Sequence, residues 1–137
     1  MKKLFILAII TFLGTVNYSC SKDDKKTESA ELIIGKWNAV SSTYDGTDSG
    51  VPDRTPIVFA ADNRVTFTYL GQGINGQDIN DGGKWQKTGN ILKVTWDTAA
   101  PGEEISTFTI TELTPNSLKW QSITDSSNKI LTENFNR

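Results

Sequence analysis

The stretch that decides the fold is GKWQKTGNILKVTW, residues 83–96. Its second half places Leu92, Val94 and Trp96 at every second position, and this period of two puts them on one face of a β-strand. The residues TGN at 88–90, between the two halves, have the composition of a tight turn. The stretch therefore predicts a β-hairpin with one apolar face.

Similar alternation continues on both sides of this hairpin. In RVTFTYL, residues 64–70, Val65, Phe67 and Tyr69 share one face, and in 104–113 a break in the phase predicts a β-bulge. Segments rich in Gly, Asn, Asp and Pro separate the apolar runs, as expected for turns between strands. Together with the hairpin, strands are predicted over 36–44, 56–60, 64–70, 104–113, 118–124 and 129–137.

These patterns predict an all-β, antiparallel domain of about eight strands joined mostly by short turns, with no sustained helical period. A small up-and-down barrel or a tight sandwich would leave no long open edge. The residues expected to point inward are Trp37, Val65, Phe67, Tyr69, Leu92, Val94, Trp96, Phe108, Ile110, Leu118, Trp120, Leu131 and Phe135.

The chain begins with a short basic segment and then an apolar one. Lys2 and Lys3 precede residues 4–13, which are apolar except for Thr11. This layout is typical of a secretory signal peptide, and a membrane-spanning helix would need about 20 apolar residues. We therefore expect residues 1–19 to be a signal peptide.

Cys20 is the only cysteine, and the chain has no histidine, which excludes an internal disulfide and a Cys/His site. The residues before Cys20 resemble the lipobox of bacterial lipoproteins through Ser19, although Asn17 and Tyr18 depart from it. The resemblance implies that Cys20 carries acyl chains in the outer membrane of a Gram-negative bacterium. The acidic residues that follow imply surface display. An ordinary signal peptide with an incidental thiol is the alternative.

Residues 20–30 are expected to form the lipidated cysteine and a flexible tether, because SKDDKKTESA at 21–30 has no large apolar side chain. The domain would then span residues 31–137. Removal of residues 1–19 takes away two lysines and no acidic residue, which lowers the formal net charge from −2 to −4. Without a basic patch, nucleic acid is not an expected partner.

The stretch IIGKWNAV, residues 33–40, opens the domain with Gly35 and Trp37 in a G-x-W pattern. It resembles the start of lipocalins and of the lipocalin-like domains of bacterial lipoproteins. The resemblance implies a barrel in which Trp37 plugs one end and a late basic residue, here Arg137, packs over the indole. The chain departs from the family in its short domain and in the lack of a helix after the barrel.

The same resemblance implies a non-enzymatic, membrane-anchored binding module for a small apolar ligand. If the barrel has a lumen, Tyr69, Trp96 and Trp120 are the candidates to line it. The alternative is that these side chains fill the core, since a small eight-stranded barrel is only just wide enough for them. A filled barrel would favour a structural or interaction subunit of a cell-envelope complex.

Two polar loops, residues 44–56 and 71–83, contain DGTDSG and DINDGG, which loosely resemble calcium loops. Neither has a glutamate at the twelfth position, so solvated turns account better for the composition. Carboxylate pairs that could in principle act as acid and base are Glu103 with Glu104 and Asp78 with Asp81. Neighbouring carboxylates on turns are usually only solvated, so we predict no catalytic residue, metal or cofactor.

Overall fold

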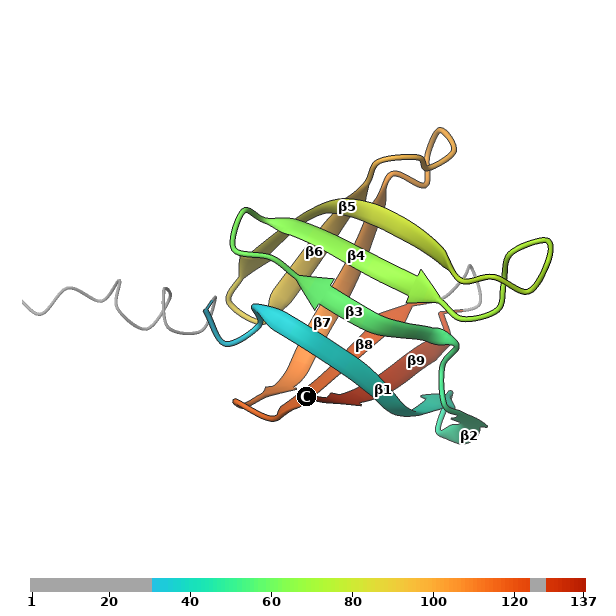
Figure 1. Cartoon of the computed structure of the whole chain (residues 1–137). Coiled ribbons are helices and arrows are strands. Elements are labelled where there is room, and N and C mark those ends of the chain that lie inside the picture. Colours follow the sequence, from blue (N-terminus) through green and yellow to red (C-terminus); the bar gives the residue numbers. More distant parts are fainter. Residues whose placement is uncertain (1–30, 124–127) are drawn as a thin grey trace, which may run out of the picture.

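The computed structural model describes residues 31–123 and 128–137 (Figure 1). The predicted signal peptide, Cys20 and the tether lie outside these residues. The strands within the described ranges are β1 (Gly35–Tyr44), β2 (Thr47–Gly50), β3 (Arg54–Phe59), β4 (Arg64–Tyr69), β5 (Ile79–Thr88), β6 (Ile91–Trp96), β7 (Ile105–Leu113), β8 (Ser117–Ile123) and β9 (Ile130–Asn136). No helix in this part of the chain has the length and apolar character needed to cross a lipid bilayer.

The strands form an antiparallel barrel (Figure 1). Neighbours in the sheet follow the order of the chain from β3 to β9, and β1 pairs with both β3 and β9. That double pairing closes an eight-stranded barrel to which β2 is added as an extra strand. The predicted all-β, up-and-down barrel of about eight strands is confirmed.

Strand β2 lies where the sequence predicted only a loop, within residues 44–56. It pairs with the second half of β1 through Ser42, Thr43 and Tyr44, whereas β3 pairs only with Gly35–Trp37. β2 therefore covers the part of the β1 edge that β3 leaves free. Its four residues are all exposed and polar or glycine, so no apolar alternation marks it in the sequence.

The interior is packed with the apolar side chains of alternate strand positions. The hairpin predicted at 83–96 is formed by β5 and β6, and the bulge predicted in 104–113 lies between Ile110 and Glu112. The buried core residues are Ile33, Trp37, Ile57, Phe59, Val65, Phe67, Trp85, Leu92, Val94, Phe108, Ile110, Leu118, Trp120 and Phe135.

Candidate functional site

One end of the barrel is closed by Trp37, at the start of β1. The indole is fully buried, and its Nε1 donates a hydrogen bond of 2.8 Å to the carbonyl of Ile33. The guanidinium carbon of Arg137 lies 4.6 Å from the centre of the Trp37 ring, and Nη2 donates to the carbonyls of Leu32 and Ile34. This geometry combines a cation–π contact with hydrogen bonds at the end of the chain.

Gly35 belongs to the same closed end. Its φ of +132° is one that residues with a side chain rarely adopt, and a Cβ there would lie 3.6 Å from the Arg137 guanidinium. The structure therefore brings Gly35, Trp37 and Arg137 together. These residues seal one end of the barrel, so a small molecule would have to enter elsewhere.

Trp120 occupies the middle of the interior. Its ring is fully buried and lies 4.7 Å from that of Phe108, 4.5 Å from Phe135 and 6.4 Å from Phe59, between ring centres. Such aromatic contacts add to the free energy of burial. These buried rings pack against one another in the interior, so Trp120 is a core residue.

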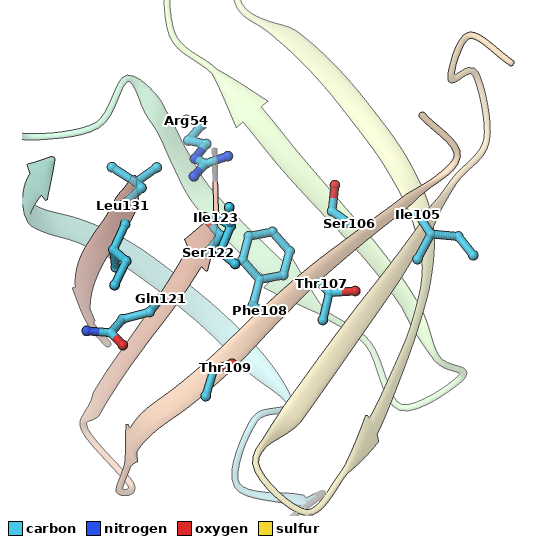
Figure 2. Close-up of a pocket in the computed structure, with 11 residues that line it drawn as sticks. Arg54, Ile105, Ser106, Thr107, Phe108, Thr109, Gln121, Ser122, Ile123 and Leu131 are labelled. Atoms are coloured by element: carbon cyan, nitrogen blue, oxygen red, sulfur yellow. The ribbon is translucent and has the colours of Figure 1, made fainter. Parts of the chain in front are cut away.

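A pocket of about 700 Å³ lies beside β7, β8 and β9, and Phe108 of this cluster is one of its lining residues (Figure 2). This volume falls within the usual range for small-molecule sites. The pocket is lined by Arg54, Ile105, Ser106, Thr107, Phe108, Thr109, Gln121, Ser122, Ile123, Ile130 and Leu131.

The pocket exists because β7 and β8 separate toward the open end of the barrel. Their register pairs run only from Thr109 to Leu113 on β7, although β7 begins at Ile105 and pairs with β6 from there. β8 in turn pairs with β9 as far as Ile123. The pocket consequently has lining residues on the inner face of the wall, such as Phe108, and on the outer face, such as Thr107.

Among the described residues that line the pocket, Arg54 is the only charged one, and a buried carboxylate holds its guanidinium. Its Nε donates a 2.9 Å hydrogen bond to Oε1 of Glu133, and its Nη2 donates to Oε2 of the same carboxylate. Glu133 is 1% exposed, and its Oε2 also accepts a 2.7 Å hydrogen bond from Nε1 of Trp120. Three donors therefore satisfy this buried carboxylate, and the two from Arg54 fix the guanidinium in place.

The other predicted lining residues lie elsewhere in the interior. Trp96 packs against Phe67 at 5.0 Å between ring centres and donates a 2.8 Å hydrogen bond to Oγ of Ser106. Tyr69 is half-buried and pairs with Arg54 in register; burial raises the pKa of its hydroxyl, which Arg54 partly offsets. Tyr69, Trp96 and Trp120 are not among the residues that line this pocket.

The charged residues in the described connections at the open end are mostly acidic. They are Asp45, Asp53, Asp78, Asp97, Glu103 and Glu104, and Asp48 lies in β2 at the same end. Lys129 lies 3.8 Å from Asp45 at this end, and Arg64 forms an ion pair with Asp97. In the described residues, no group of three or more acidic side chains is arranged to hold a metal ion.

The carboxylates considered for calcium or catalysis have structural roles. Oδ1 of Asp48 accepts the backbone N–H of Gly50 at 2.8 Å, and Oδ1 of Asp78 accepts that of Gly71 at 2.9 Å. Oε1 of Glu104 accepts the N–H of Gly102, and such backbone bonds lower the pKa of Glu104. These bonds stabilise turns.

Sequence reasoning did not single out Arg54 and Glu133. In the alternation of β9, Glu133 has the same phase as the apolar residues Leu131 and Phe135. The sequence therefore indicated that this charged side chain points inward. A buried charge of this kind requires a partner. Arg54, which is 79 residues away, could not be identified as that partner from the sequence.

Comparison with known proteins gives a consistent result. A family model described as a lipocalin-like domain matches residues 33–120. A lipocalin-like protein from Bacteroides uniformis is similar in structure, with a TM-score of 0.59 and 17% identity over 77% of this chain and 98% of that chain. A protein from Bacteroides eggerthii, with 12% identity, covers the same shares at a TM-score of 0.57.

A more distant similarity is to lobster apocrustacyanin A1, with a TM-score of 0.55 and 14% identity over 82% of this chain and 64% of that chain. No curated protein matches the sequence. At these identities, the similar structures support the fold of the barrel alone.

Proposed function

The chain belongs to the lipocalin-like domain family, and on that basis we propose that it binds a small, largely apolar molecule in the pocket between β7 and β9. The observation that carries the proposal is the pocket of about 700 Å³ with Arg54 fixed at its edge. Five apolar and six polar residues line the pocket, so it offers a ligand both apolar contact and hydrogen bonds. The family is typically one of binding proteins and not of enzymes, which supports a binding function.

A direct test uses N-phenyl-1-naphthylamine, an uncharged probe whose fluorescence rises in apolar surroundings. We expect saturable binding with one site per chain. Replacing Ser122→Trp should abolish it, because this side chain lines the inner wall of the pocket and a large ring there would fill the space. The matched control is Val58→Trp, at an exposed position on β3, which should leave binding unchanged.

A second candidate function, an interaction subunit of an envelope complex, has one observation in its favour. Ile105 and Ile123 are 61% and 67% exposed beside the pocket, and Ile130 is 42% exposed. Exposed apolar side chains that lie together often mark contact surfaces. If the probe does not bind, or binds equally to the Ser122→Trp variant, the small-molecule proposal fails and this second function becomes the better one.

Membrane attachment through Cys20 is a part of the proposal that rests on the sequence. Its support is the signal-peptide layout and the lipobox resemblance. The described chain begins at Glu31, directly before the closed end of the barrel formed by Gly35 and Trp37 (Figure 1). An anchor upstream of Glu31 would therefore attach at the end opposite the open loops.

A further inference from the structure

Arg54 and Glu133 form a pair with no net charge at the pocket. The charge of this pair determines which class of ligand binds there. The carboxylate of Glu133 accepts from both Nε and Nη2 of Arg54, so the positive charge is compensated within the protein. Glu133 is itself buried, so its charge is compensated mainly by Arg54 and little by bulk water. An anion that binds at Arg54 would place a second negative charge beside Glu133 with one cation between them, which is unfavourable away from bulk water.

Arg54 nevertheless retains hydrogen-bond donors for a ligand. A guanidinium has five N–H groups in a fixed plane. Within the described residues, its bonds to Glu133 use Nε and Nη2, and Nη1 has no protein acceptor. The side chain is 23% exposed and reaches from β3 to the space near Ser122 and Phe108 (Figure 2). It can donate to an acceptor oxygen without a change in net charge.

The electrostatic potential at the open end also favours uncharged ligands over anions. Six acidic residues occupy the described connections there and Asp48 lies in β2, while Lys129 and Arg64 pair with two of them, and the chain as a whole has a formal net charge of −2. A rim with an excess of acidic groups lowers the local concentration of anionic ligands. Fatty-acid anions would thus be disfavoured both at the entrance and at Arg54.

We infer that the ligand is an uncharged amphipathic molecule, with an apolar body against Phe108 and Leu131 and one ketone, ester or hydroxyl oxygen that accepts from Arg54. This inference rests on the proposed binding function and specifies its ligand class. The neutral Arg54–Glu133 pair then acts as a selectivity element against carboxylates. Ser106 and Ser122 supply the remaining polar groups of the inner lining.

The test compares 2-decanone with decanoate at pH 7.4, each used to displace bound N-phenyl-1-naphthylamine. The two molecules match in chain length and differ in charge. We expect 2-decanone to displace the probe at a concentration at least tenfold lower than decanoate. If decanoate displaces the probe as well as the ketone does, or if the ketone does not displace it, the inference is wrong while the proposed binding function stands. If the probe itself does not bind, both are wrong.

A variant tests the role of the pair directly. Glu133→Gln keeps an acceptor for Trp120 but removes the charge that compensates Arg54, so decanoate binding should become about tenfold tighter while 2-decanone binding changes little. Glu112→Gln, which removes an exposed carboxylate on β7, is the matched control. Unchanged decanoate binding in a folded Glu133→Gln protein would overturn the inference. If this variant does not fold, the wild-type comparison of the two ligands decides.

Discussion

Arg137 shows how a single side chain can seal the end of a barrel. It stacks on Trp37 and donates two hydrogen bonds, of 2.7 and 2.8 Å, to main-chain carbonyls before β1. These carbonyls precede the first strand, and the strand ladder does not pair them. The last residue of the chain thus ties the start of the domain to its end.

Replacing Arg137→Ala should lower the free energy of unfolding by about 1–2 kcal/mol, because a cation–π contact contributes roughly 0.5–2 kcal/mol and the hydrogen bonds are partly solvated. Urea denaturation measures this change. Arg137→Lys, which keeps the charge but loses the planar guanidinium, should have an intermediate effect. A wild-type urea midpoint for Arg137→Ala would show that the contact does not stabilise the fold.

Tyr69 should make the stability of the protein fall at high pH. Burial raises the pKa of its hydroxyl in the folded state, whereas the unfolded side chain titrates near its ordinary value of about 10. Above that pH the unfolded state loses a proton that the folded state keeps, so unfolding becomes more favourable as the pH rises.

The melting temperature of the Tyr69→Phe variant should therefore fall less between pH 8 and pH 10.5 than that of the wild type. The lowered pKa of Lys87 also acts in this range, but it is common to both proteins and cancels in the comparison. Circular dichroism melts at the two pH values provide the measurement. If the melting temperature falls equally in both proteins, burial does not keep the Tyr69 hydroxyl neutral in the folded state.

At the scale of elements, the contact between β5 and β6 depends on Gly83. This inward-facing residue pairs with Trp96, and a Cβ at its position would lie 2.5 Å from the carbonyl oxygen of Thr95. That distance is shorter than real Cβ contacts, and the obstructing atom belongs to the backbone. The two strands can therefore approach this closely only with glycine here.

Gly83→Ala should destabilise the protein by about 1–3 kcal/mol, the usual cost of overpacking. Lys84→Ala, at the next and exposed position of β5, is the control and should change stability by no more than about 0.5 kcal/mol. Urea midpoints of the three proteins test this difference. If both substitutions have the same small effect, β5 and β6 can accommodate a Cβ at position 83, and their close approach does not require glycine.

The separation of β7 from β8 is the feature of the elements on which the proposed binding function depends. β7 is longer than its pairing with β8, and β8 pairs fully with β9. The bulge between Ile110 and Glu112 adds to this divergence, since bulges bend and twist a strand. The wall of the barrel consequently opens at one side and not only at its end.

At the scale of the whole molecule, the barrel has a packed closed end and an open end with acidic loops. If Cys20 carries lipid, the closed end lies on the membrane side and the pocket is accessible from the opposite side.

The corresponding prediction concerns localisation. Produced from the full sequence in a Gram-negative host, the wild-type protein should be found in the membrane fraction and pass into the detergent phase. Cys20→Ala should be found in the soluble fraction with an unchanged melting temperature, because the substitution lies outside the domain. Membrane association of the Cys20→Ala variant would exclude lipid anchoring at this residue.

Much of the architecture could be predicted from the sequence because strand alternation is local. The period of two in Val65–Tyr69 and Leu92–Trp96 depends only on neighbouring residues, and so does the turn at 88–90. β2 could not be predicted, because its polar residues are held by pairing with β1 and bury no apolar face.

The sequence by itself determined the fold class, the strand phases and the family, since all of these follow from patterns within short segments. The tertiary structure alone decided where the pocket lies and what controls it. The pocket arises from the point at which β7 and β8 diverge, and its polar element joins Arg54 to Glu133 across 79 residues. Such contacts depend on the closure of the barrel, which brings distant strands together, and no local pattern specifies them.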